Sequence, residues 1–168
     1  VSTPEVHDVI RLEDDTNRVD GYIDGEHHKP AVLILAAGLG TRLNNLNDEL
    51  NKSLFPINNR AVLSHIIDKF PTDYDFIIAI GYRGDLIREY CKQSHPNHNF
   101  TFVEVDSIED EKSGPGYSAL QCEKLLNRPF YISTCDCLIA GELPKLDGNW
   151  LGVYPTVYPE KYSTVNIS

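Results

Sequence analysis

The sequence contains no methionine, a single tryptophan and no long hydrophobic run among its 168 residues. No apolar segment approaches the ~20 residues with which a helix crosses a bilayer, so we expect no transmembrane segment and no membrane partner. Acidic residues at positions 5, 8 and 13 argue against a secretory signal peptide, and we expect a cytoplasmic protein. The missing methionine at position 1 favours a segment of a longer or processed chain, with additional domains left open.

Positive charge is scarce as well, because 15 Lys and Arg face 25 Asp and Glu, giving a net charge of −10 at pH 7. Nucleic-acid binding needs a basic surface that displaces counterions from phosphates, so we expect no nucleic-acid partner. The four cysteines, at positions 91, 122, 135 and 137, lack the paired spacing of a zinc site. They are expected to be small buried apolar residues in a reducing compartment.

From residue 31 onward, segments typical of strands alternate with segments of helical periodicity. Continuous apolar runs at residues 31–35 and 76–81 are typical of strands buried on both faces of a sheet. Further strands are predicted over residues 100–105 and 130–135, and helices over 61–67, 84–93 and 117–126. This order predicts an α/β, Rossmann-like fold with a mostly parallel sheet and helices on both faces.

Residues 1–29 have a different pattern. Strand-like residues 9–12, a turn cluster at 13–17 and alternating residues 19–23 predict a short β-hairpin, or the last piece of an upstream domain. Residues 27–30 then read as a linker. The sequence therefore predicts a domain over residues 30–168, preceded by this hairpin.

A loop of small residues follows the first buried strand. Residues 35–42 read Leu-Ala-Ala-Gly-Leu-Gly-Thr-Arg, and Gly38 and Gly40 would let the backbone approach a ligand and present its N–H groups. The loop is neither a P-loop nor a dinucleotide fingerprint, because Leu43 stands where a third glycine is required. A glycine pair after a strand is by itself also an ordinary tight turn. Arg42 and Lys52 would add a bidentate fork and a point charge for phosphate oxygens.

Three features fall at the carboxyl ends of predicted strands, where ligands of parallel sheets bind. They are the glycine loop at 37–41, Gly81 and Asp136. A carboxylate at such a strand end suits Mg²⁺, which takes one or two carboxylates together with phosphate oxygens and waters. The competing interpretation of Asp136 alone is a turn or helix N-cap residue.

The loop at 35–42, taken with the later string Asn-Lys-Ser-Leu-Phe-Pro-Ile at 51–57, resembles the signature of the sugar-nucleotide pyrophosphorylases. These are nucleotidyltransferases of the sugar-1-phosphate and phosphocholine type, and the resemblance covers roughly residues 30–168. It implies the nucleotide-diphospho-sugar transferase fold, and a domain truncated at its C-terminal side, since members usually continue further. Cys135 stands where many relatives have glycine, a feature similar to the molybdopterin-guanylyltransferase-like branch.

The resemblance implies a Mg²⁺-dependent transfer of a nucleoside monophosphate from a nucleoside triphosphate to a sugar 1-phosphate or similar phosphorylated alcohol, with release of pyrophosphate. Arg42 would bind the leaving pyrophosphate, Lys52 would neutralise charge at the transferring centre, and Asp136 would hold the metal. The residues expected to bind the nucleotide are Leu35, Ala36, Ala37, Gly38, Leu39, Gly40, Thr41, Gly81, Gly114, Pro115 and Gly116. Pro115 is equally compatible with a plain helix start.

Two other functions are open alternatives. A non-catalytic nucleotide-sensing or scaffold subunit would share the fold, but such relatives usually lose Arg42, Lys52 or the metal-binding Asp. A nucleotide-sugar glycosyltransferase would need Asp-x-Asp at the metal strand, and residues 135–137 read Cys-Asp-Cys. The sequence does not specify the base, the phosphorylated acceptor or the oligomeric state, and a homo-oligomer is left open.

Overall fold

The computed structural model describes residues 8–11, 29–40, 49–106, 114–139, 141–153, 155–158 and 160. The chain divides into two compact units, one formed by Val19–Leu138 and the other by Val1–Arg18 together with Ile139–Ser168. In the described part of the chain, no helix is long and apolar enough to cross a membrane.

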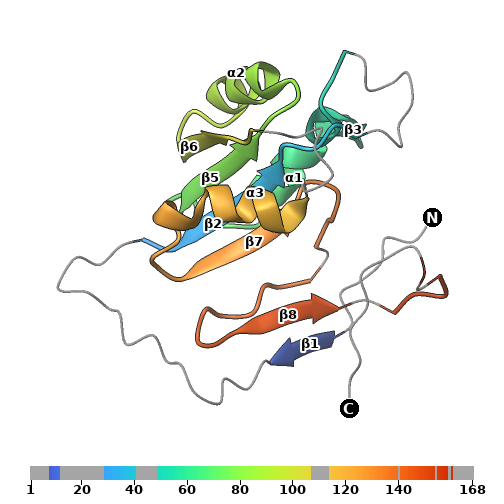
Figure 1. Ribbon diagram of the computed structural model, residues 1–168, viewed down its shortest axis with the longest axis vertical. Helices are drawn as coiled ribbons and strands as arrows, with labels where there is room; N and C mark the ends of the chain where they lie inside the picture. The colour runs from blue at the N-terminus through green and yellow to red at the C-terminus, as the bar shows by residue number, and fades with distance from the viewer. Residues whose placement is uncertain are drawn as a thin grey trace. The chain divides into compact units, whose positions relative to one another are not determined.

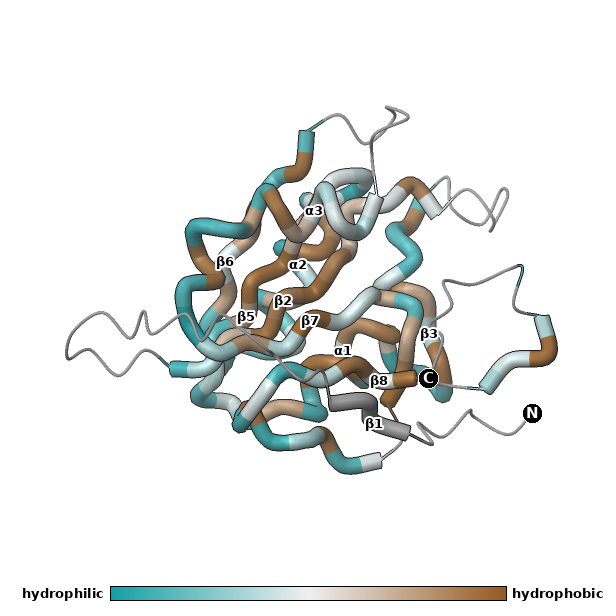
Figure 2. The backbone as a smooth tube through the Cα atoms, turned by 60° about the horizontal axis from the view of Figure 1, so that its bottom comes forward, coloured by the Kyte–Doolittle hydropathy of each residue, from teal (hydrophilic) through white to brown (hydrophobic). Residues whose placement is uncertain are grey.

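A parallel four-stranded sheet with the order β6-β5-β2-β7 forms the centre of the larger unit (Figure 1). Its strands are β2 (Ala31–Ala36), β5 (Asp75–Ile80), β6 (Asn99–Glu104) and β7 (Phe130–Thr134). The central strands β2 and β5 are buried along almost their whole length, and Figure 2 shows both as hydrophobic segments. This burial accounts for their continuous apolar sequences. The parallel pairing of all four strands confirms the predicted parallel sheet.

The helices of this unit cover both faces of the sheet. They are η2 (Lys52–Leu54), α1 (Val62–Ile67), α2 (Gly84–Ser94), α3 (Pro115–Gln121) and η3 (Glu123–Leu125), of which η2 and η3 are 3₁₀ turns. The chain steps from β2 to β5 and β6 in one direction and returns past both to β7. Because such crossovers are right-handed, α1 and α2 cover one face and α3 covers the other, in front of the sheet in Figure 1. The helix predicted over 117–126 is split into α3 and η3.

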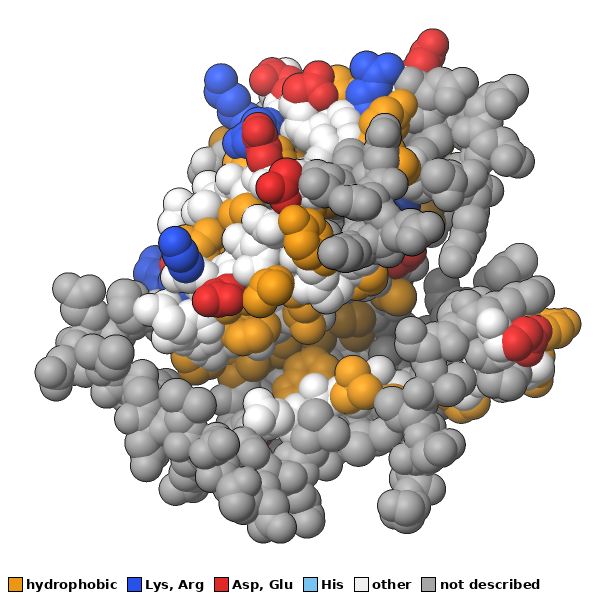
Figure 3. Space-filling view, viewed as in Figure 1, with side chains coloured by type: hydrophobic (Ala, Val, Ile, Leu, Met, Phe, Trp, Pro, Cys, Tyr) orange, Lys and Arg blue, Asp and Glu red, His pale blue; other side chains and the backbone are white. Residues whose placement is uncertain are grey.

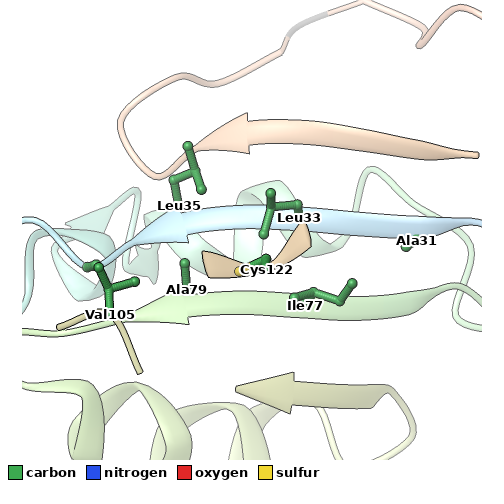
Figure 4. Close-up of a cluster of buried hydrophobic side chains, with 8 residues drawn as sticks. Ala31, Leu33, Leu35, Ile77, Ala79, Val105 and Cys122 are labelled. Atoms are coloured by element: carbon green, nitrogen blue, oxygen red, sulfur yellow. The ribbon is translucent and has the colours of Figure 1, made fainter. Parts of the chain in front are cut away.

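Alternate side chains of the central strands pack toward opposite faces. Leu33 of β2 and Ile77 of β5 pack with Cys122, the residue that follows α3 in the sequence, in the hydrophobic cluster of Figure 4. On the other face, the ring of Phe70 lies 6.2 Å from that of Phe76 and 5.2 Å from that of Tyr131. Fully burying a side chain of this size contributes about 1.5–3 kcal/mol, so both faces stabilise the sheet.

Strand β7 has exposed side chains on the same face of the sheet on which α3 packs against β2 and β5. Phe130 and Ile132 are paired with Ala31 and Leu33 and therefore lie on that face, where they are 38% and 54% exposed. Among the described residues, α3 contacts β2 and β5, and its own Leu120 is 61% exposed. Figure 3 shows hydrophobic side chains exposed on this side of the unit.

A buried hydrogen-bonded group connects α1 to the end of α2. The hydroxyl oxygen of Ser64 lies 2.6 Å from the Tyr90 hydroxyl and 2.7 Å from Nε2 of His95. Ser64 and His95 are both buried. Burial lowers the pKa of the His95 imidazole, so the ring is neutral at neutral pH and can share a hydrogen bond with the hydroxyl.

Two further strand pairs are short. Strands β3 (Pro56–Ile57) and β4 (Arg60–Ala61) form a hairpin directly after η2. Asn58 and Asn59 have positive φ angles of 50° and 62°, as a two-residue type I′ turn requires. In the smaller unit, β1 (Asp8–Arg11) pairs antiparallel with β8 (Trp150–Val153). The strand expected at 9–12 is thus β1, but its expected hairpin partner at 19–23 lies outside the described residues.

The amino ends of the four strands are joined by one polar network. Asp75, at the start of β5, accepts a 2.7 Å hydrogen bond from Asn99 at the start of β6 and pairs with Arg128, just before β7. Arg128 also donates to the carbonyl of Lys29, before β2, at 3.1 Å. Desolvation acts to raise the pKa of Asp75, but the hydrogen bonds from Asn99 and Arg128 and the Arg128 charge outweigh it and lower the pKa.

Replacing Asp75 by Asn should therefore destabilise the protein, because Arg128 is only 16% exposed and loses its charged partner. We expect a loss of about 1–3 kcal/mol in the free energy of unfolding at neutral pH, measured by urea denaturation. The folded-state pKa of Asp75 lies below 3.8, so its contribution is present above that pH and is lost as the pH falls through the folded-state pKa.

The control is Asp68→Asn, which breaks the more exposed ion pair between Arg60 and Asp68. That variant should lose less than about 1 kcal/mol. The difference between wild type and Asp75→Asn should shrink below about pH 4. An unchanged difference across this range would contradict the assigned role of the carboxylate.

Candidate functional site

The carboxyl ends of β2, β5 and β7 meet at one edge of the sheet, because parallel strands in register end together. Ala36 is paired with Ile80 at the end of β5, and Leu35 with Thr134 at the end of β7. Backbone hydrogen bonds continue beyond the strands, from Tyr82 N to Ala37 O at 3.2 Å and from Cys135 N to Leu35 O at 3.3 Å. The structure therefore brings the start of the glycine loop, Gly81 and Asp136 to the same edge.

The described part of the glycine loop ends at Gly40. Leu35, Ala36 and Ala37 are buried, whereas Gly38 is exposed. Gly40 has a φ of 67°, a left-handed conformation that favours glycine. A Cβ added at Gly38 would meet nothing within 4 Å, so packing within the protein does not require glycine there. The expected site residues Thr41 and Arg42 lie outside the described residues.

Lys52 and Asp136 are in direct contact at this edge, although 84 residues separate them in the sequence. The Nζ atom of Lys52 donates a hydrogen bond to Oδ2 of Asp136 at 3.1 Å. Lys52 is the first residue of η2, and Asp136 lies in the turn after β7. Their side chains are 26% and 59% exposed, so both charged groups remain open to a ligand.

The carboxylate of Asp136 is ionised at neutral pH. Desolvation acts to raise its pKa, but hydrogen bonds from the Thr134 side chain and from Lys52, together with the Lys52 charge, lower the pKa overall. The neighbouring Cys135 thiol is buried, and burial raises its pKa to about 11, so it stays protonated and points into the core. Of these side chains, Asp136 is the one that offers an anionic ligand at the strand end.

Asn51, immediately before Lys52, is fully buried at 0% exposure and joins three segments of this edge. Its Nδ2 donates to the carbonyl of Ala36 at 3.1 Å and to that of Tyr82 at 2.7 Å. Its Oδ1 accepts a hydrogen bond from the backbone N–H of Ser53 at 2.9 Å and caps η2. Sequence reasoning assigned this residue no role in the site, although it is the first residue of the string at 51–57 that carries the resemblance.

The loop expected to contact the nucleoside forms the start of α3. Pro115 occupies the first turn of the helix, and Ser118 N donates to Gly114 O at 3.0 Å. The helix-start interpretation of Pro115 is thus confirmed. Gly114 has an extended φ of 176°, and added Cβ atoms at Gly114 and Gly116 would meet nothing within 4 Å. A nucleotide-binding role for this loop stays a prediction.

Comparison with known proteins gives a consistent set of relatives, although no family model matches the chain. The D-glycero-α-D-manno-heptose 1-phosphate guanylyltransferase of Campylobacter jejuni is 28% identical over 142 residues, covering 80% of this chain and 62% of that protein. The mannose-1-phosphate guanyltransferase of Aspergillus oryzae is 30% identical over 112 residues, covering 63% of this chain and 30% of that protein.

A solved structure extends this similarity to the fold. The CTP:phosphocholine cytidylyltransferase of Streptococcus pneumoniae matches with a TM-score of 0.52 and 26% identity, over 72% of this chain and 51% of that one. The chain thus spans less than two thirds of the length of each of these three proteins. The relatives and the solved structure agree with one another, and the chain is similar to sugar-nucleotide and phosphocholine nucleotidyltransferases.

Proposed function

We propose that this chain carries the nucleotide-binding part of a Mg²⁺-dependent nucleotidyltransferase. The enzyme would transfer a nucleoside monophosphate from a nucleoside triphosphate to a phosphorylated small-molecule acceptor and release pyrophosphate. The observation that carries the proposal is the contact of Lys52 with Asp136, 3.1 Å apart beside the glycine loop. The proteins reported above are named for transfers of this kind, which supports the same class of reaction here.

The reaction requires positioning and charge stabilisation rather than a side-chain nucleophile. An oxygen of the acceptor phosphate forms a bond to the α-phosphorus, while the bond from that phosphorus to the bridging oxygen breaks and pyrophosphate leaves with the electron pair. The ammonium group of Lys52 would stabilise negative charge on the transferring or leaving phosphate. N–H groups of Gly38 and Leu39 would bind the triphosphate, and Arg42 is proposed for the pyrophosphate.

The residues at this edge fit a magnesium ion bound together with the nucleotide. Among the described residues there is no group of three or more His, Cys, Asp or Glu side chains placed to hold a metal. Mg²⁺ does not need one, because it commonly uses one or two carboxylates with substrate phosphates and waters. Asp136, ionised and half-exposed, would be its protein ligand. Bound there, the ion would supply positive charge that polarises the α-phosphate.

The direct test is pyrophosphate release by the purified protein with Mg²⁺. Each of GTP, CTP, ATP and UTP is combined with mannose 1-phosphate, a heptose 1-phosphate and phosphocholine, the acceptors that the relatives' names suggest. The nucleoside triphosphate with the preferred base should also raise the melting temperature of the protein, in proportion to the logarithm of the nucleotide concentration. Nucleotide binding with no pyrophosphate release for any acceptor would favour the non-catalytic alternative, and the absence of both would contradict the proposal.

Asp136→Asn is expected to remove the metal dependence of nucleotide binding, because the neutral amide is a poor ligand for Mg²⁺. In wild type, Mg²⁺ should tighten nucleotide binding, measured by calorimetry with and without the ion, whereas the variant should show little difference. Stability should change by less than about 1 kcal/mol, since the Lys52–Asp136 pair is exposed. Asp73→Asn, an exposed acid in the turn before β5, is the control and should keep the full metal effect.

Gly38→Ala should weaken nucleotide binding without destabilising the protein. A methyl group fits at position 38 in the protein alone, so the free energy of unfolding should change by less than about 0.5 kcal/mol. The same methyl would stand between the loop and a closely bound phosphate, and we expect about 10-fold weaker binding.

Gly84→Ala is the contrasting variant, since its Cβ would lie 3.0–3.3 Å from side-chain atoms of Ile80. It should lose about 1–3 kcal/mol of stability through overpacking. If both variants bind nucleotide as wild type does, the loop is an ordinary turn.

A further inference from the structure

We propose that Asn51 is a positioning residue that holds Lys52 in place relative to the nucleotide loop and the turn after β5. The inference rests on the proposed function of Lys52, and it adds a residue that touches neither the substrate nor the metal. Its basis is a buried side chain whose hydrogen bonds reach Ala36, Tyr82 and Ser53, which belong to three different segments.

The amide group of Asn51 is fully used. The two donated bonds go to the carbonyl oxygen of Ala36, at the end of β2, at 3.1 Å and to that of Tyr82, in the turn after β5, at 2.7 Å. The side-chain oxygen accepts a backbone N–H at 2.9 Å. The residue has 0% exposure, so an unpaired polar group left here would cost about 1–3 kcal/mol. These bonds also fix which end of the amide faces the strands, since carbonyl oxygens accept only from the nitrogen.

Helix capping alone does not explain an asparagine at this position. Ser, Thr or Asp would cap the short helix η2 about as well. None of these residues can donate two hydrogen bonds to two separate carbonyl groups at neutral pH. The requirement for an amide therefore comes from the carbonyl groups of Ala36, at the end of β2, and Tyr82, in the turn after β5, and not from the helix that follows.

The connection matters because Lys52 has a long and flexible side chain. Its ammonium group reaches Asp136 from the first residue of η2, and η2 is a single turn of three residues. A short turn of this kind has little rigidity of its own. Asn51 joins it to Ala36, after which the glycine loop begins, and to Tyr82, the residue after Gly81. The position of the Lys52 charge relative to a bound triphosphate is thus set by the sheet.

The test compares Asn51→Ser with a matched control. Serine retains a capping oxygen for η2 but loses both bonds, to the carbonyl groups of Ala36 and Tyr82. The control is Ser64→Ala, which removes an equally buried polar group with two hydrogen-bond partners, at the α1–α2 contact. Thermal unfolding monitored by circular dichroism verifies that both variants fold cooperatively. Both are then assayed for kcat and for KM for nucleotide.

For Asn51→Ser, we expect kcat to fall about 10²-fold, the loss that a misplacement of about 1 Å can cause, with a smaller change in KM. Ser64→Ala should keep kcat within about 2-fold, since it is matched in burial but its side-chain hydrogen bonds go to Tyr90 and His95 and not to Ala36 or Tyr82. A kcat that is unchanged in Asn51→Ser, or lowered equally in both variants, would overturn the proposal.

A second measurement does not depend on enzymatic activity. Acetylation of lysines by an acylating reagent is followed by peptide mass spectrometry, with Lys69, Lys92 and Lys124 as internal standards. In Asn51→Ser, labelling of Lys52 should rise about 3-fold relative to these lysines, because its ammonium is no longer held against Asp136. If wild type releases no pyrophosphate, the proposed function fails, and this labelling still decides the role of Asn51.

Unchanged labelling of Lys52 in folded Asn51→Ser would overturn the positioning role. Loss of cooperative unfolding in Asn51→Ser, with Ser64→Ala still folded, would also overturn it, because Asn51 would then serve the fold as a whole.

Discussion

The parallel register of β2 against β5 and β7 is the constraint on which the rest of the site depends. Ala36 lies beside Ile80 on one side, and Leu35 lies beside Thr134 on the other. A shift of either neighbour by one residue would exchange the side chains that pack on the two faces of the sheet. It would also move Asp136 away from Lys52, whose contact spans 84 residues of sequence. Packing of the apolar strands therefore places charged groups that are themselves exposed.

Much of this fold follows from the sequence because the central strands have a strong signal. Buried parallel strands read as continuous apolar runs, and Phe76–Ile80 is such a run. The parallel order and the placement of helices on both faces follow from the handedness of the crossovers. The pairing of β1 with β8 could not be predicted, since strands so far apart in the sequence carry no local signal of register. Strands β3 and β4, two residues each, are too short for a periodicity.

The same contrast holds for the candidate site. Lys52 and Asp136 were predicted as site residues because Lys52 lies in the string at 51–57 and Asp136 directly follows a predicted strand. The structure brings the two side chains together. Asn51 belongs to the same string at 51–57 but was assigned no role, because asparagine is ordinarily an exposed turn or cap residue and nothing in its neighbours shows that it is fully buried. Its importance arises from the carbonyl groups of Ala36 and Tyr82, which every sequence provides. Contacts of a side chain with distant backbone leave no pattern in the sequence.

The network of Asp75, Asn99 and Arg128 at the amino ends of the strands has a consequence for how such a protein diversifies. It ties β5 to its neighbours at the edge opposite to the glycine loop, so this part of the sheet's cohesion involves none of the loops proposed to meet a ligand. Natural selection can exchange those loops, and with them the substrate, while this clamp is retained. Substitutions in those loops can therefore change the substrate with little effect on the stability of the sheet.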